Sequence, residues 1–227
     1  RRKERWVARE TRPFTSRTRL AGFEKFYPGR ETNRIPMKKQ SIGPRTVLYP
    51  HPVLVIGTYD ASGRPDAMVA AWGGICSSRP PAAAVSVQKT RQTYTNLVEQ
   101  REFTISIPSV NYIRETDYFG IVSGRDEDKF AVTGLTPVKG DLVNAPYVGE
   151  FPVVLECRLL QTVEIGVHTQ FIGEILDVKM DEGVVGDDGR PDLDKIRPIA
   201  YDSMRQEYYG HGKTLGKAFS AGKGIKR

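Results

Sequence analysis

The sequence predicts a mainly β protein, a β-barrel of antiparallel strands with short helices between them. Three observations lead to this prediction. Apolar residues mostly alternate with period two, as they do in half-buried strands. Two long strand patterns are joined by a tight turn, which is typical of a hairpin. Strands and helices do not alternate as in a parallel sheet, so a doubly wound nucleotide-binding fold is not expected.

The first half of the barrel is expected between residues 53 and 108. Residues 53–59 are rich in β-branched side chains, and the Asp-Ala-Ser-Gly-Arg cluster that follows is typical of a turn. Residues 102–108 alternate strictly, which indicates a strand. The expected elements, in order, are strand 53–59, turn 60–64, strand 67–72, strand 82–88, helix 93–100 and strand 102–108.

The second half is dominated by one long hairpin. Residues 153–164 and 168–179 are two strand patterns separated only by Ile-Gly-Val at 165–167. The residues around this hairpin have helix, loop or irregular composition. They comprise helix 111–120, the polar loop 123–129, an exposed Asp- and Gly-rich loop at 181–194, and an irregular Gly- and Lys-rich arm from residue 210.

The positive charge is concentrated at one end of the chain. Residues 1–36 hold eleven of the 34 Lys and Arg residues and four of the 27 acidic ones, which accounts for the whole net charge of +7. The domain proper, residues 37–227, is therefore neutral, and nucleic acid is not an expected partner. We interpret residues 1–36 as a wrongly assigned or vector-derived start ahead of Met37. The alternative is a genuine basic arm that contacts phosphate or a partner.

Several common sites are not expected. The GxSxG, HExxH, paired CxxC and GxGxxG motifs do not occur, and no histidine has a second ligand at metal-binding spacing. Gly212-Lys213-Thr214 matches the end of a phosphate-binding loop, but Glu207 stands where the first glycine is required. Apolar runs are far shorter than the ~20 residues of a membrane span. With two cysteines in no metal spacing, a reducing, cytoplasmic setting is expected.

Two short segments together suggest a mononucleotide site. Trp72-Gly73-Gly74 follows a strand, and a flat indole beside two glycines can border a planar heterocycle. Lys89, Arg91, Thr93 and Asn96 cluster where the helix 93–100 begins, and the start of a helix can receive a phosphate. Taken singly, each segment has an ordinary alternative. The tryptophan is then a core residue, and Thr93 merely caps the helix.

From Met37 to about Gly222 the chain resembles the flavin reductase-like, FMN-binding split-barrel family, and within it the flavoredoxins. The segments that carry the resemblance include Asp66-Ala-Met-Val-Ala-Ala-Trp-Gly-Gly-Ile75 and His168-Thr-Gln-Phe-Ile-Gly-Glu174. Their order and spacing are more specific than any one of them. The other matching segments are residues 52–58, 80–86, 102–108, 123–125 and 128–130.

The resemblance implies a homodimer with one FMN per subunit near the interface. The flavin ring is expected beside Met68–Trp72, the phosphate near Lys89 and Thr93, and Tyr201 is expected to close the pocket. Asp66 and Tyr201 depart from the family pattern, in which asparagine and phenylalanine are frequent at these positions. The full set of expected cofactor-binding residues is Asp66, Met68, Ala70, Trp72, Ser86, Lys89, Thr93, Asn96, Lys129 and Tyr201.

Two further residues receive chemical roles from the resemblance. His168 is expected to face the flavin or nicotinamide and is the candidate catalytic residue, although without the resemblance it is more typical of a hydrogen-bonded structural histidine. Lys129 is expected to reach the cofactor, where a cation would stabilise the reduced flavin and raise its potential.

The predicted function is an FMN-dependent oxidoreductase that passes electrons from NADH or NADPH to free flavin or another acceptor. The first alternative is a flavoredoxin-type electron carrier that binds FMN tightly and is reduced by another protein. A third hypothesis is a cofactor-free interaction module whose basic leader recruits a polyanion.

Overall fold

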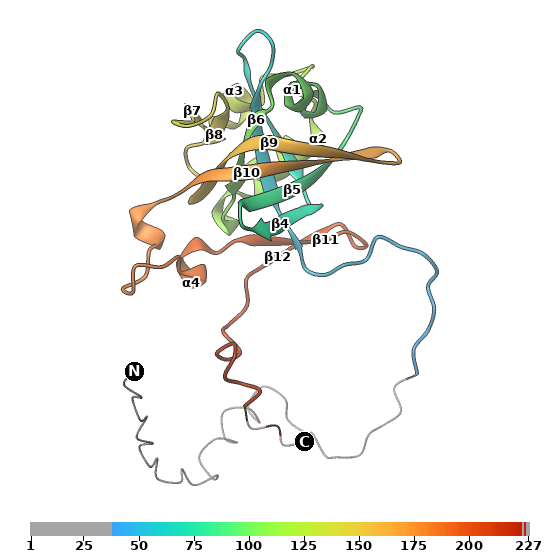
Figure 1. The fold of residues 1–227 in the computed structure, drawn as a ribbon, viewed down its shortest axis with the longest axis vertical. Helices are drawn as coiled ribbons and strands as arrows, with labels where there is room; N and C mark the ends of the chain where they lie inside the picture. Colours follow the sequence, from blue (N-terminus) through green and yellow to red (C-terminus); the bar gives the residue numbers. More distant parts are fainter. Residues whose placement is uncertain (1–37, 224, 226–227) are drawn as a thin grey trace, which may run out of the picture. The chain divides into compact units, whose positions relative to one another are not determined.

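The largest element of the fold is a seven-stranded antiparallel sheet with the order β3-β2-β6-β9-β10-β5-β4 (Figure 1). The computed structural model describes residues 38–223 and 225, and the fold below is that of the compact unit that starts at Thr46. The expected leader, residues 1–36, lies outside the described residues. The strands of this sheet are β2 (Leu54–Tyr59), β3 (Pro65–Ala70), β4 (Gly73–Ser78), β5 (Pro81–Gln88), β6 (Glu102–Ile107), β9 (Val153–Ile165) and β10 (His168–Met180).

The long hairpin confirms the clearest strand prediction. β9 and β10 pair from His168↔Ile165 to Met180↔Val153, and β10 also pairs with β5 along seven residues, His168 to Glu174. In Figure 1 the two strands form a ribbon that extends beyond the rest of the sheet at its turn. Apolar side chains from these strands meet those of β2 and β6, and Phe103, Phe171 and Ile56 are fully buried in this core.

Within the described residues, four α-helices, two 3₁₀ turns and two smaller sheets accompany the large sheet. The predicted helix 93–100 is α1 (Gln92–Gln100), and the predicted helix 111–120 is a 3₁₀ turn, η1 (Val110–Tyr112), followed by α2 (Ile113–Ile121). One smaller sheet has the order β1-β11-β12, and in the other β7 pairs with β8. The remaining elements are β1 (His51–Pro52), α3 (Lys129–Thr133), β7 (Pro137–Lys139), β8 (Pro146–Val148), η2 (Glu182–Val184), α4 (Leu193–Ile196), β11 (Ile199–Asp202) and β12 (Glu207–Gly210).

The sequence does not predict β4, β11 or β12. β4 lies at the sheet edge with most of its side chains exposed, so its residues lack the alternation of a half-buried strand. It is a strand because it pairs with β5, from Gly73↔Val85 to Ser78↔Pro81. The expectation of a loop throughout 181–194 is also wrong in part, since η2 and the start of α4 fall within it.

Two simpler properties bear on the setting of the protein. None of the described helices is long and apolar enough to cross a membrane. Cys76 and Cys157 are both free thiols, the first exposed and the second buried. Burial and the neighbouring Glu156 raise the pKa of Cys157 to about 12, so this thiol stays protonated and unreactive at neutral pH. The cytoplasmic setting stays a prediction.

Candidate functional site

Two adjoining cavities lie where β3, β5 and the start of α1 meet. We call the first the strand-end cavity, about 310 Å³ in volume, and the second the helix-start cavity, about 200 Å³. Met68, Gln88 and Arg91 line both cavities, so the two form one continuous site. The strand-end cavity is lined by Thr46, Met68, Val69, Ala70, Ala71, Trp72, Ser86, Val87, Gln88, Arg91, His168, Tyr201 and Ser203. The helix-start cavity is lined by Asp66, Met68, Gln88, Thr90, Arg91, Gln92, Thr93, Val122, Ser123, Gly124 and Lys129.

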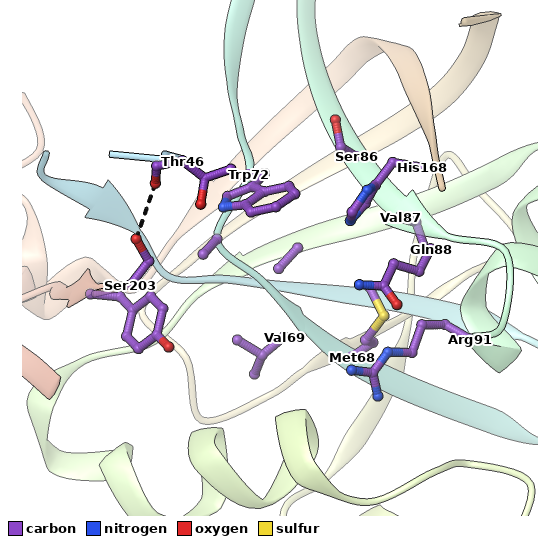
Figure 2. A pocket seen from close by; sticks show the side chains of 13 residues that line it. Thr46, Met68, Val69, Trp72, Ser86, Val87, Gln88, Arg91, His168 and Ser203 are labelled. Carbon is purple, nitrogen blue, oxygen red and sulfur yellow. Dashed lines mark hydrogen bonds between the residues drawn. The ribbon is translucent and has the colours of Figure 1, made fainter. Parts of the chain in front are cut away.

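Aromatic rings border one side of the strand-end cavity. Trp72 follows β3 and is 39% exposed, and its ring centroid lies 4.7 Å from that of His168, with 43° between the ring planes. Figure 2 shows the two rings side by side, with Met68 and Arg91 across the cavity from them. The backbone fixes this arrangement, because Ser86 N donates to Trp72 O over 2.8 Å and His168 pairs with Gln88. Such a surface suits a planar heterocycle.

Another side of the strand-end cavity comes from the small sheet β1-β11-β12 and from the turn between β11 and β12. Ser203 donates to the carbonyl oxygen of Thr46 over 3.3 Å (Figure 2), and Tyr201 packs against Tyr208, with ring centroids 5.4 Å apart. Tyr208 in turn donates to Asp117 Oδ1 over 2.9 Å. Burial, with the added effect of the Asp117 carboxylate, raises the pKa of Tyr208 well above its ordinary value. Tyr208 therefore stays neutral and links Tyr201 to Asp117 of α2.

The helix-start cavity opens at the N-terminus of α1. Its N-cap residue, Arg91, has an extended backbone and no side-chain capping hydrogen bond. Thr93 does not cap the helix either: it is the second residue of α1, and its hydroxyl donates to Asp66 Oδ2 over 3.3 Å. Arg125 adds a second guanidinium nearby and donates to Gln92 Oε1 over 2.9 Å. Uncapped N–H groups and two guanidinium groups make this end of the site suitable for an anion.

A buried ion pair lines the helix-start cavity. Lys129 Nζ lies 2.7 Å from Asp66 Oδ1, and both side chains are almost fully buried. Asp66 belongs to β3, where it pairs with Thr58, whereas Lys129 is the first residue of α3. The Lys129 ammonium also donates to the carbonyl oxygen of Ala67. The pair thus ties α3 to the strand that leads to Trp72.

The structure brings eight of the ten predicted cofactor-binding residues, and His168, to this site. The strand-end cavity has Met68, Ala70, Trp72, Ser86, Tyr201 and His168, and the helix-start cavity has Asp66, Thr93, Lys129 and Met68 again. Their contact with a cofactor stays a prediction. Of the two glycines after Trp72, Gly74 has open space around it, whereas a Cβ on Gly73 would lie 2.8 Å from the carbonyl oxygen of Ala84. The packing of β4 on β5 therefore requires Gly73.

The other two predicted residues line neither cavity. Lys89 is half exposed and forms an ion pair with Glu164 of the β9–β10 hairpin. Asn96 is fully buried and donates to Thr58 Oγ1 over 2.9 Å, which joins α1 to β2. Lys89 is adjacent in sequence to Gln88 and Thr90, which line the site, whereas Asn96 follows the lining residue Thr93 by three positions. The side chains of both predicted residues are committed to other partners.

Gln88 lines both cavities but is absent from the predicted set. The signal for it was present in the alternation of β5, since residues two apart on a strand share a face and Ser86 is in the predicted set. Gly124 has no comparable signal. It lines the helix-start cavity because the loop after α2 folds back, where Arg64 donates to its carbonyl oxygen over 2.5 Å.

Comparison with known proteins identifies the family. The profile of the flavin reductase like domain matches residues 46–205. This chain belongs to the flavin reductase like family. Flavoredoxin of Desulfovibrio vulgaris (Miyazaki F) is 54% identical and superimposes with a TM-score of 0.79, covering 82% of this chain and all of that one. These findings confirm the predicted family and its mainly β, split-barrel fold.

More distant relatives also cover most of this chain. Flavoredoxin from Methanosarcina acetivorans is 29% identical, with a TM-score of 0.77 over 82% of this chain and 98% of that one. An uncharacterized protein of Archaeoglobus fulgidus is 31% identical over 158 residues, which is 69% of this chain and 86% of the relative. The question for the two cavities is therefore whether their side chains fit a flavin.

Proposed function

We propose that this chain binds FMN in the continuous site formed by the two cavities. The observation that carries the proposal is their arrangement, with aromatic side chains bordering one cavity and a helix N-terminus with two arginines at the other. A mononucleotide has a planar ring at one end and a phosphate at the other, so it matches both chemistries. In this proposal Trp72, Met68 and Tyr201 hold the ring, and Arg91 and the first turn of α1 hold the phosphate.

We further propose that the protein is an oxidoreductase that uses NADH or NADPH as the electron donor and free flavin or another protein as the acceptor. Bound FMN supplies the electron-transfer chemistry, which the side chains do not have. The side chains orient the ring and exclude water from it. His168 lies beside Trp72 with its ring tilted, and in this proposal it is the side chain that faces the flavin or the nicotinamide.

A flavoredoxin-type carrier without a nicotinamide site is the second candidate. The specific observation in its favour is the 54% identity to a flavoredoxin that is covered over its full length. The two candidates share the cofactor and differ only in the electron donor. A kinetic experiment that compares electron donors distinguishes the two candidates.

The first experiment tests cofactor binding and the second the donor. Purified protein is expected to be yellow, or to take up added FMN with quenching of flavin fluorescence; a colourless protein that takes up none would reject both redox functions and favour the interaction module. The FMN-loaded protein is then mixed anaerobically with NADH or NADPH. Rapid bleaching of the flavin supports the reductase, whereas bleaching only with a reduced redox protein supports the carrier.

We also propose that the chain forms a homodimer through the edge strand β4. On this strand Ile75 is 70% exposed, and Trp72, the residue that precedes the strand, is 39% exposed. An unpaired sheet edge with exposed apolar side chains is a surface for pairing. Light scattering is expected to give a dimer mass for the wild type and a monomer mass for Ile75→Glu. Val132→Glu, on the exposed side of α3, is the matched control and should stay dimeric.

A further inference from the structure

The carboxylate of Asp66 is the central acceptor of the helix-start cavity. It lies next to the Lys129 ammonium and accepts the Thr93 hydroxyl, so it contacts two of the residues predicted to hold a cofactor. Both interactions direct these polar groups toward Asp66. In the structure, therefore, neither the lysine nor the threonine is free to serve an anion by itself.

The geometry around Asp66 is closely packed but incompletely hydrogen-bonded. A Cβ on Gly124 would lie 2.3 Å from Asp66 Oδ1, so only glycine fits beside this oxygen. The same oxygen is buried and accepts no hydrogen bond of good geometry from the described residues, although the Lys129 ammonium is within 2.7 Å. Asp66 Oδ1 therefore interacts mainly with the Lys129 ammonium, and the two charges neutralise each other.

The charges of the helix-start cavity can be counted from its lining. Asp66, Arg91 and Lys129 are the charged residues, which gives a formal charge of +1. Arg91 is exposed and has no ion-pair partner among the described residues. Since Asp66 and Lys129 cancel, the positive charge that the lining offers to a ligand comes from Arg91 and the start of α1. Arg125 lies outside the lining and adds the same charge in every variant compared below.

We propose that Asp66 positions Lys129 and, by neutralising it, lowers the affinity of the helix-start cavity for a phosphate group. This inference rests on the proposed binding of FMN. Asp66 then sets how strongly the site prefers FMN to riboflavin, the same ring system without the phosphate. We call the ratio of the riboflavin Kd to the FMN Kd the phosphate preference.

Four proteins test this inference, with both dissociation constants measured by quenching of flavin fluorescence. The cavity charge is +2 in Asp66→Asn, +1 in the wild type and in the double variant Asp66→Asn/Lys129→Met, and zero in Lys129→Met. The phosphate preference is expected to rise about tenfold in Asp66→Asn and to fall about tenfold in Lys129→Met, as for a unit charge in a partly screened site. The double variant should stay within about twofold of the wild type.

The double variant decides between neutralisation and direct contact. If Lys129 binds the phosphate regardless of Asp66, the double variant will lose the preference as Lys129→Met does, and the inference is overturned. An unchanged preference in Asp66→Asn also overturns it. The double variant buries no unpaired charge, so it is informative even if a single variant fails to fold.

Two controls separate this inference from the proposed function. If the wild type binds neither flavin, the proposed function itself fails. If it binds FMN and riboflavin equally, flavin binding stands, but the inference fails together with the phosphate position proposed at the start of α1. Lys179→Met breaks another ion pair whose residues line neither cavity, and it should leave the phosphate preference unchanged.

Discussion

Two buried carboxylates of this protein, Glu156 and Asp66, are each paired with a lysine, and they differ in how fully they are hydrogen-bonded. Glu156 on β9 is fully buried and accepts from the backbone N–H groups of Asp141 and Leu142 as well as from Lys179. Asp66 accepts one long hydrogen bond, from Thr93, and pairs with Lys129 at the edge of a cavity.

This difference indicates that Glu156 contributes to the stability of the fold and that Asp66 contributes to the properties of the cavity. Glu156 holds the loop between β7 and β8 against the sheet, and both of its oxygens have donors. Such a saturated group contributes to stability and has no capacity left for a ligand. Asp66 retains an oxygen without a good donor next to an open cavity. We therefore expect changes at Glu156 to alter stability and changes around the cavities to alter binding.

The largest effect is expected for Glu156→Ala. This change leaves Lys179 and two backbone N–H groups without their buried acceptor and should lower the free energy of unfolding by roughly 3 kcal/mol. Chemical denaturation of the cofactor-free protein measures it. FMN affinity at a temperature where the variant is folded should stay within about twofold of the wild type. If Glu156→Ala lost as much free energy of FMN binding as free energy of unfolding, Glu156 would belong to the binding site as well as to the fold, and the distinction from Asp66 would be wrong.

The next effect is expected at the cavity. Trp72→Ala removes the ring that borders the strand-end cavity and should weaken FMN binding about tenfold, or ~1.4 kcal/mol, with little change in stability because the side chain is partly exposed. Fluorescence titration gives the affinity. Trp72→Phe should restore most of it. Leu160→Ala, a 46% exposed apolar residue that lines neither cavity, should bind FMN like the wild type.

A smaller effect is expected when the pH is lowered. Burial opposes ionisation of Glu156, but the Lys179 ammonium and the two backbone N–H groups together hold its pKa below the ordinary value of 4.5. A carboxylate whose pKa is lower in the folded state stabilises the fold above its unfolded pKa and loses that contribution as the pH falls through the folded value. Wild-type stability should therefore fall more steeply below pH 4.5 than that of Glu156→Gln. Parallel curves from pH 7 to pH 3 would contradict this.

The smallest effect is expected for Lys89→Ala. Lys89 forms a half-exposed ion pair with Glu164 and lines neither cavity, so its loss should change stability by less than about 0.5 kcal/mol. The phosphate preference should change less than about twofold. A tenfold fall would show that Lys89 leaves Glu164 for the phosphate, which would extend the site to the hairpin and confirm the original prediction for this residue.

The sequence was most informative where neighbouring residues determine the structure. The β9–β10 hairpin and α1 follow from local periodicity and turn chemistry, and the expected bounds agree with the structure within a residue or two. The two ends of the site, at Trp72 and Thr93, were also predictable, because each depends on a short segment at a strand end or a helix start. Pairing partners such as those of β4 had no such local signal.

What the sequence by itself determined is the family, the antiparallel β architecture and nine of the residues that line the two cavities. Only the tertiary structure decided what each polar side chain does there. It paired Lys129 with Asp66 and Lys89 with Glu164, and it enclosed Asn96 against β2. The physical reason is that a charged or amide side chain takes the best partner within reach after folding, and these partners come from segments far apart in the chain.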